Sequence, residues 1–311
     1  MTVLVTGGAG FIGSNLIAGL NRAGEHDVIV VDSLLQAEKH LNLNGLRIAD
    51  YLDKSALVEV LPKLGELGAI FHQGACTSTT ERDGRYMMEN NYAYSKRLLH
   101  YALDRRVPFI YASSAAVYGN GERGFEETEA CEWPLNVYAY SKLQFDNYVR
   151  RLGGAAESVV AGIRYFNVYG PREGHKGPMA SVAYQLHGQY RRGEPMRIFQ
   201  GSQEFRRDFV YVEDVVRVNL FLFERRVSGI FNCGTGRARS FVDVGRRMQQ
   251  LCPGARLEEI PFPPELAGKY QKFTEAHLGR LRGQGYVRDF IALEEGLGRY
   301  VAALGPGGAD A

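Results

Sequence analysis

A glycine-rich turn close to the start of the chain limits the possible folds most strongly. Residues 6–13 read Thr-Gly-Gly-Ala-Gly-Phe-Ile-Gly, after a short apolar run typical of a strand and before a run typical of a helix. Gly7 permits a tight turn because a positive φ has no steric cost at glycine. Gly10 lets a ligand approach the backbone, and Gly13 lets the helix lie near the strand. Since a helix N-terminus offers free N–H groups and partial positive charge, the pattern predicts a dinucleotide pyrophosphate site.

A carboxylate follows at the expected distance. Residues 28–31 form a second apolar run, and Asp32 ends it, nineteen residues beyond Gly13. An acid at this place accepts hydrogen bonds from the ribose of a bound dinucleotide. The glycines are evenly spaced by three residues, unlike the dehydrogenase pattern, so an ordinary glycine turn stays the alternative.

Strand-like and helix-like runs alternate through the first half of the chain. Helical patterns at 57–64, 86–104 and 138–152 are separated by strand-like runs at 69–72, 107–112 and 158–164. This alternation predicts an α/β fold, a Rossmann-type doubly wound parallel sheet whose ligands bind at the carboxyl ends of the strands. The second half mixes loops, short strands and helices, which indicates a smaller mixed α/β substrate-binding domain. We expect the dinucleotide-binding domain at 1–168, with later returns near 205–235 and 275–292, and the mainly substrate-binding domain at 169–311.

Composition argues against several classes of protein. The 311 residues carry a net charge of +2 with acids and bases interspersed, which disfavours a nucleic-acid or membrane-surface protein. There is no apolar run long enough for a membrane span and no signal-peptide pattern, so we expect neither membrane spanning nor secretion. Cys76, Cys131, Cys233 and Cys252 form no Cys-x-x-Cys pair, which predicts reduced thiols in a cytoplasmic protein and no metal site.

A tyrosine and a lysine four residues apart are candidates for acid–base chemistry. Tyr138 and Lys142 share one face of the predicted helix. A tyrosine is a poor base at neutral pH, but a nearby ammonium and an oxidised nicotinamide favour its phenolate, which can take the proton of a carbinol while hydride leaves. Ser114 ends a predicted strand at the ligand edge and can bind the same hydroxyl. Each residue alone has a structural explanation, a packed helix face or a turn cap, but their order along the chain favours catalysis.

The ordered set of glycine turn, serine and Tyr-x-x-x-Lys resembles the extended short-chain dehydrogenase/reductase family, and the likeness covers nearly the whole chain. Many members of that family act on nucleotide-linked sugars. The resemblance implies that Tyr138 is the base, that Lys142 activates it and binds the ribose, and that Ser114 is the third member. Asn90 resembles the asparagine near the cofactor ribose.

Longer motifs resemble the ADP-L-glycero-D-manno-heptose 6-epimerases in particular. The similar segments are 74–80, 86–92, 164–177, 206–211 and 270–274, of which the Arg-Glu-Gly-His-Lys-Gly extension and the Met-Met pair are the most specific. This resemblance implies an isomerase with one tightly bound NADP per subunit. Such an enzyme oxidises C6 of ADP-D-glycero-D-manno-heptose to a ketone and reduces it from the opposite face. The product is a precursor of the lipopolysaccharide core, and a homo-oligomer, a homopentamer, is expected.

Inversion at one carbon requires a second acid/base. A single base on one side deprotonates one epimer, whereas the alkoxide formed after hydride return to the other face needs a proton donor elsewhere. The resemblance assigns this role to Lys176, since low solvent exposure can suit a lysine to proton transfer. A solvated loop lysine is the alternative.

The cofactor is open from chemistry alone. Asp32 suggests NAD because it accepts from a free 2′-hydroxyl, whereas Lys39 can meet the 2′-phosphate of NADP. The resemblance places Lys39 and Lys54 at the adenosine end and favours NADP. The cofactor contacts it implies are Gly7, Gly10, Phe11, Ile12, Gly13, Asp32, Ser33, Lys39, Lys54, Gln73, Gly74, Ala75, Cys76, Thr77, Asn90, Lys142, Val168 and Lys176.

The substrate residues include one candidate from side-chain chemistry. Arg207 can clamp a diphosphate bidentately, although a surface salt bridge is the alternative. The resemblance adds Asn167, Phe199, Gln200, Gly201, Ser202 and Tyr270. Two substrate positions depart from the family: Pro178 replaces a serine and Gln185 replaces a histidine, which bears on the identity of the sugar or nucleotide.

Two rival functions remain open. One is a 4-epimerase or 4,6-dehydratase acting on UDP- or dTDP-hexoses. Dehydratases usually place an acid pair just after the active-site serine segment, where this chain has Ala115-Ala116-Val117. The other is a binding module that kept the fold but lost turnover, which the intact Ser114, Tyr138 and Lys142 disfavour.

Overall fold

The main layer of the molecule is a seven-stranded parallel sheet. The computed structural model describes residues 1–153, 157–263 and 271–305. The sheet has the order β10-β6-β5-β4-β1-β2-β3, and neighbouring strands run parallel. Its strands are β1 (Val3–Thr6), β2 (Val28–Asp32), β3 (Asp50–Asp53), β4 (Ala69–His72), β5 (Phe109–Ser114), β6 (Val160–Tyr165) and β10 (Gly229–Cys233). The Rossmann-type α/β fold predicted from the sequence is confirmed.

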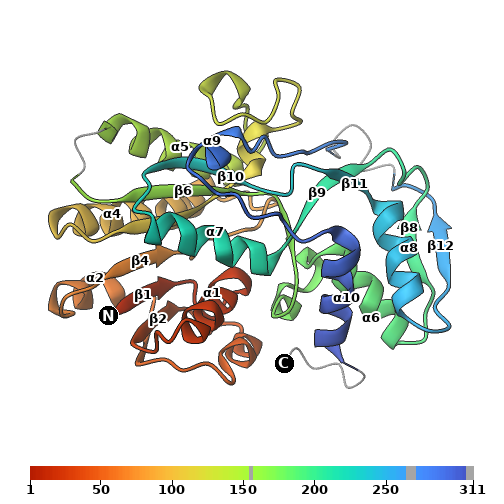
Figure 1. Ribbon diagram of the computed structural model, residues 1–311, viewed down its shortest axis with the longest axis horizontal. Coiled ribbons are helices and arrows are strands. Elements are labelled where there is room, and N and C mark those ends of the chain that lie inside the picture. Colours follow the sequence, from red (N-terminus) through yellow and green to blue (C-terminus); the bar gives the residue numbers. More distant parts are fainter. Residues whose placement is uncertain (154–156, 264–270, 306–311) are drawn as a thin grey trace.

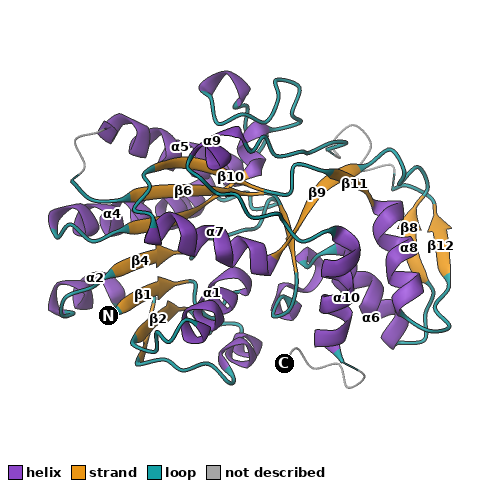
Figure 2. Cartoon of the chain, viewed as in Figure 1, coloured by secondary structure: helices purple, strands orange, loops and turns teal. Residues whose placement is uncertain are grey.

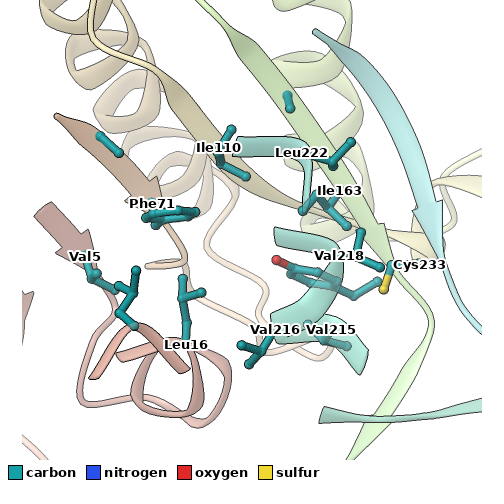
Figure 3. Packing of buried hydrophobic residues seen from close by; sticks show 14 of the residues in the cluster. Val5, Leu16, Phe71, Ile110, Ile163, Val215, Val216, Val218, Leu222 and Cys233 are labelled. Atoms are coloured by element: carbon teal, nitrogen blue, oxygen red, sulfur yellow. The ribbon is translucent and has the colours of Figure 1, made fainter. Parts of the chain in front are cut away.

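Helices cover both faces of this sheet (Figures 1 and 2). They are α1 (Phe11–Arg22), α2 (Leu57–Val60), α3 (Gly84–Met88), α4 (Tyr94–Asp104), α5 (Val137–Leu152) and α7 (Val212–Glu224). Alternate residues of each strand point to opposite faces, so the sheet separates two apolar clusters. Val5 and Phe71 pack with α1 and α7 on one face, as Figure 3 shows, whereas Leu4 and Ile70 pack with α2, α4 and α5 on the other.

A smaller unit lies beyond the carboxyl ends of the strands, at the right of Figure 1. It contains the three-stranded sheet β11-β9-β7 and the two-stranded sheet β12-β8, and these pack with three helices around their own apolar cluster. Its elements are β7 (Asn167–Tyr169), α6 (Val182–Arg191), β8 (Met196–Phe199), β9 (Arg206–Tyr211), β11 (Ala238–Ser240), α8 (Phe241–Leu251), β12 (Leu257–Ile260) and α10 (Leu293–Leu304), while the short helix α9 (Gly279–Gly283) contacts β10.

Several boundaries differ from the sequence-based expectation. The helix after the glycine turn begins at Phe11, because Gly10 already serves as its N-cap. The single helix expected at 86–104 is interrupted by a π-helical turn, Glu89–Ala93. The loop expected at 170–178 contains a 3-10 helix, Gly174–Met179. The following helix begins only at Val182, because the Ser181 hydroxyl caps it.

The burial of His72 predicts that the fold becomes less stable in acid. It ends β4, and its ring nitrogens lie 2.6 Å from Thr6 Oγ1 and 2.7 Å from Ser95 Oγ. Burial, assisted by the charge of Lys142, lowers the pKa of His72 to about 3. In the unfolded chain the His72 ring takes up a proton near pH 6.5, whereas in the folded protein it stays neutral until about pH 3. The stabilisation of the fold by neutral His72 is therefore present above pH 6.5 and is lost as the pH falls towards 3.

The measurement is urea unfolding of the wild-type protein and His72→Gln at pH 7 and pH 5. We expect the free energy of unfolding of the wild type to fall by about 2 kcal/mol more than that of the variant between pH 7 and pH 5. This figure follows from the interval of about 1.5 pH units between pH 6.5 and pH 5, at 1.36 kcal/mol each. Equal losses in the two proteins would contradict the assignment, because the variant cannot titrate at this position.

Among the described residues, no helix is sufficiently long and apolar to span a membrane. The four cysteines are free thiols. In the same part of the chain, no group of three or more His, Cys, Asp or Glu side chains is arranged to hold a metal ion.

Candidate active site

A pocket of about 370 Å³ lies where the predicted sheet edge meets the smaller unit. The ends of β5 and β6 form part of its wall, together with the start of α1 and the segment that precedes α6. The lining residues that the sequence analysis had assigned are Phe11, Ile12, Gln73, Ala75, Thr77, Ser114, Tyr138, Lys142, Asn167, Val168 and Lys176. The structure therefore brings both candidate acid/base residues, Tyr138 and Lys176, to one cavity from separate elements.

The glycine turn has almost no room for side chains. Gly7 has a φ of 68°, and a Cβ there would lie 2.6 Å from the backbone nitrogen of Gly74. A Cβ at Gly13 would lie 2.1 Å from the carbonyl oxygen of Gly7. Both positions thus require glycine. Gly7 packs against the segment after β4, and Gly13, in the first turn of α1, packs against Gly7. A Cβ at Gly10 would lie 3.0 Å from the same carbonyl, a tight contact.

Asp32 connects this turn to the expected adenosine end. Its Oδ2 accepts a 2.8 Å hydrogen bond from the backbone nitrogen of Ala9, and its Oδ1 accepts one of 2.7 Å from Ser33. Oδ1 also forms an ion pair with Lys39. The carboxylate is therefore neutralised and held against the glycine turn. Nearby, the Lys54 amine hydrogen bonds to Asn90 Oδ1, so these two residues also lie together.

Tyr138 and Lys142 stand one turn apart on α5, whose N-cap Asn136 accepts a 2.9 Å hydrogen bond from Ala139. Burial raises the pKa of Tyr138, and a hydrogen bond with the Ser114 hydroxyl offsets part of that shift. Burial lowers the pKa of Lys142 to about 8, against the opposing charge of Asp146. Since this value is still above 7, Lys142 is mostly an ammonium at neutral pH.

A buried ionic network fixes α5 to the sheet. Asp146, one turn beyond Lys142, accepts hydrogen bonds of 3.0 Å from Tyr111, 2.9 Å from Ser113 and 2.9 Å from Arg164 Nε. Arg164 is fully buried and also pairs with Glu132. No role was predicted for Asp146 from the sequence; its place four residues after Lys142 is the signal that points to it.

Lys176 belongs to the 3-10 helix between β7 and α6. Its side chain is 26% exposed, its Nζ lies 3.4 Å from Glu173 Oε2, and the same nitrogen lies 5.0 Å from the centre of the Phe11 ring. The amine is thus held against the start of α1 and does not extend into bulk solvent.

The loop that carries Lys176 is fastened to the dinucleotide-binding region. Asn15 Nδ2 donates to the Pro171 carbonyl at 2.9 Å, and Asn42 Nδ2 lies 3.0 Å from His175 Nδ1. Asn42 Nδ2 also donates to the Ala9 carbonyl at 2.9 Å. One asparagine therefore links the glycine turn to the Lys176 loop.

Only part of the expected substrate set reaches the pocket. Asn167 lines it and accepts a 3.3 Å hydrogen bond from Thr274. Arg207 lies behind the wall, with its guanidinium 5.7 Å from the ring centre of the lining residue Phe241. Gln185 donates a 2.7 Å hydrogen bond to the Gly177 carbonyl and so braces the loop next to Pro178.

A turn at the end of β8 contains Phe199, Gln200, Gly201 and Ser202, and in it Ser202 N donates to Phe199 O at 3.1 Å. They are not among the lining residues, nor are Gly74, Cys76, Lys39, Lys54 or Asn90. Tyr270 lies outside the described residues. The roles assigned to the site residues, whether or not they line the pocket, stay predictions.

Ten further residues line the pocket without a sequence-based assignment. They are mostly apolar or aromatic and come from strands, loops and helix ends that meet only in the folded chain: Ala112, Ser113, Tyr165, Phe166, Met179, Ala180, Ser181, Val182, Phe209 and Phe241. A wall assembled from β9, α8 and the segment before α6 has no local sequence pattern from which it could be found.

Residues 3–234 match the sequence model of the NAD dependent epimerase/dehydratase family, and the chain belongs to that family. The chain is 52% identical over 309 residues to the ADP-L-glycero-D-manno-heptose-6-epimerase of Brachyspira hyodysenteriae, covering 97% of both chains. This similarity confirms the resemblance found in the motifs.

Solved structures show the same fold. The ADP-L-glycero-D-manno-heptose-6-epimerase of Helicobacter pylori is 32% identical, with a TM-score of 0.85, covering 97% of this chain and 96% of the other. The UDP-glucose 4-epimerase of Thermotoga maritima is 29% identical, with a TM-score of 0.80 and coverage of 97% and 98%. Because enzymes named for different sugars share the fold, the substrate has to be argued from the site.

Proposed function

We propose that this protein is an ADP-L-glycero-D-manno-heptose 6-epimerase, an isomerase that interconverts the D-glycero and L-glycero forms of ADP-heptose for lipopolysaccharide core synthesis. The observation that carries the proposal is that Tyr138 and Lys176 line one pocket from different elements. The 52% identity to the Brachyspira enzyme supports the choice of substrate.

Tyr138 takes the proton of the C6 hydroxyl, and the neighbouring Ser114 hydroxyl stabilises the phenolate through the hydrogen bond that lowers its pKa. Lys142, held by the Ala112 carbonyl at 2.9 Å, supplies positive charge and binds the ribose. When bound, the nicotinamide supplies hydride transfer from C6 and back. Inversion requires that the C6 carbonyl turn its opposite face to the nicotinamide, which would bring its oxygen to Lys176. Lys176 donates a proton to that oxygen, and in the reverse direction Lys176 takes the proton and Tyr138 donates it.

The residues present fit a dinucleotide, and we propose that it is NADP. The crowded glycine turn and the N-terminus of α1 suit the pyrophosphate. Asp32 is already paired with Lys39, so this end does not present a free carboxylate that would repel a 2′-phosphate. Lys39, Lys54 and Ser33 would hold that phosphate, and Asn90 the ribose. NAD is the alternative that a binding comparison separates.

We propose that the ADP-heptose is held by Arg207, Asn167, Pro178, Gln185, the 199–202 turn and Tyr270. Arg207 would bind the diphosphate and Asn167 the sugar. We also propose a cytoplasmic homo-oligomer, with the pentamer as the expected size, which analytical ultracentrifugation tests.

The deciding experiment is incubation of the purified protein with ADP-D-glycero-D-manno-heptose, without added cofactor, followed by chromatographic separation of the epimers. Formation of the L-glycero epimer supports the proposal. UDP-glucose and dTDP-glucose are the matched alternatives. Turnover of either of these in place of ADP-heptose would show that the substrate is wrong while the fold and acid/base residues are right. A bound nicotinamide with no turnover of any sugar would favour a binding module.

Lys176→Met is expected to lower kcat of epimerisation by about 10²- to 10⁴-fold, the range for a general acid/base. The methionine keeps the apolar contact with Phe11 but cannot transfer a proton, so the unfolding temperature should change little. Lys63→Met is the control, since that lysine is exposed and does not line the pocket. Wild-type kcat in Lys176→Met would contradict the two-base mechanism.

A further inference from the structure

Glu173 is a fully buried carboxylate that the mechanism above does not use. It immediately precedes the 3-10 helix that carries Lys176, and its side chain is 0% exposed. A buried charge is costly unless it is paired and hydrogen-bonded. The contacts of this carboxylate therefore indicate its role in the protein.

The two carboxylate oxygens receive donors from three elements. Oε2 accepts a 2.7 Å hydrogen bond from the backbone nitrogen of Ser181. Oε1 accepts hydrogen bonds of 2.6 Å from the Ser181 hydroxyl, 2.9 Å from the Tyr300 hydroxyl on α10 and 3.5 Å from the backbone nitrogen of Gly170 after β7. These donors are neutral. Within the described ranges, Lys176 is the one cation within 4.0 Å of the carboxylate, at 3.4 Å from Oε2.

The geometry fixes the carboxylate more firmly than the lysine. Ser181 caps α6, and Tyr300 belongs to α10, so Glu173 is held by two helices of the smaller unit. Lys176 has a flexible side chain that is 26% exposed, and its ordered contacts are Glu173 and the Phe11 ring. A rigid anion next to a flexible cation determines where the cation rests.

We propose that Glu173 is a positioning residue that holds the Lys176 ammonium at the pocket wall, ready to donate its proton. The proposal rests on the proposed function, because it concerns one of the two acid/base residues of the epimerase. It also connects the C-terminal helix α10 to the chemistry through Tyr300.

The first test requires neither substrate nor added cofactor. The purified protein is treated briefly with a limiting amine-acylating reagent, and mass spectrometry compares acylation of Lys176 with that of the exposed Lys63. Glu173→Gln should raise the Lys176 ratio about threefold, the size expected for a part-exposed ion pair. Tyr300→Phe removes a neutral donor but leaves the carboxylate charged, so it should raise the ratio less than Glu173→Gln does. An unchanged ratio in Glu173→Gln overturns the proposal.

The second test separates positioning from general stability. Single-turnover oxidation of each ADP-heptose epimer is followed through the absorbance of the reduced nicotinamide. Lys176→Met should slow the oxidation of one epimer, and Glu173→Gln should slow the same epimer by about 10- to 100-fold, as for a misplaced catalytic group. The other epimer should change less than about twofold, since Tyr138 serves it. Equal slowing of both epimers would point to a structural role and contradict the proposal.

Two further variants complete the design. The double variant Glu173→Gln with Lys176→Met should be no slower than Lys176→Met alone, because residues that act as one unit are not additive. Glu173→Asp keeps the charge but moves it away from Lys176 by one methylene, so its acylation ratio and oxidation rate should lie between those of the wild type and Glu173→Gln. If Glu173→Gln does not fold, Glu173→Asp replaces it in both tests. If the wild type epimerises no ADP-heptose, the proposed function fails while the labelling result still decides whether Glu173 holds Lys176.

Discussion

Tyr138→Phe should lower kcat of epimerisation by about 10³-fold and leave the fold intact. The substitution removes one oxygen, the atom that hydrogen bonds to Ser114 and that we propose takes the proton of the sugar hydroxyl. The ring keeps its packing on α5, and the Ser114 hydroxyl keeps the 3.1 Å hydrogen bond that it accepts from the Ala116 backbone nitrogen. Epimer formation measures kcat, and thermal unfolding measures the fold.

The chain provides a matched control for this prediction. Tyr140 lies on the same helix but is 47% exposed, and the residue four positions later is Gln144. Tyr140→Phe should therefore epimerise at the wild-type rate. Tyr138→Phe that keeps more than a tenth of wild-type kcat would show that the proton goes to another group.

Arg164→Met should lower the free energy of unfolding by about 3–5 kcal/mol, the usual loss when one partner of a buried ion pair is removed. The guanidinium is fully buried between Asp146 and Glu132, whose side chains are 0% and 4% exposed. Methionine fills much of the volume but leaves both carboxylates without this cation. Urea unfolding at pH 7 provides the measurement.

Arg106→Met is the control for the same change at the surface. Arg106 pairs with Glu157, but the two side chains are 73% and 70% exposed, so the expected loss is at most about 1 kcal/mol. If the two variants lost equal stability, the buried network would contribute no more than a surface pair, contrary to the prediction.

The sequence predicts strands where the local pattern is strongly apolar. The runs that become β1, β2 and β4 are buried on both faces, which is typical of parallel sheets. β3 was missed because Asp50–Asp53 reads Asp-Tyr-Leu-Asp at the edge of the sheet, where burial is slight. β7 was missed because it follows β6 after a single residue, Phe166, and has no pattern of its own.

In the candidate site, too, residues in local patterns were predicted and tertiary contacts were not. Ser114, Tyr138 and Lys142 were found because local spacing reports which residues share a strand end or a helix face. The anchoring of Lys176 by Glu173 was not found, because it depends on Ser181 and Tyr300 converging from other parts of the chain. Tertiary partners of this kind leave no period in the sequence.

The π-helical turn at Glu89–Ala93 has a consequence for how this segment can change in evolution. Two consecutive residues serve separate regions there: Asn90 accepts from the Lys54 amine, whereas Asn91 exchanges 2.8 and 2.9 Å hydrogen bonds with the backbone of Cys76. Loss of one residue would restore regular winding but remove one of these two adjacent side-chain positions, so Asn90 and Asn91 could no longer serve both regions. Descendants of this sequence can therefore exchange side chains in the segment more readily than they can shorten it, and insertions and deletions should be found elsewhere.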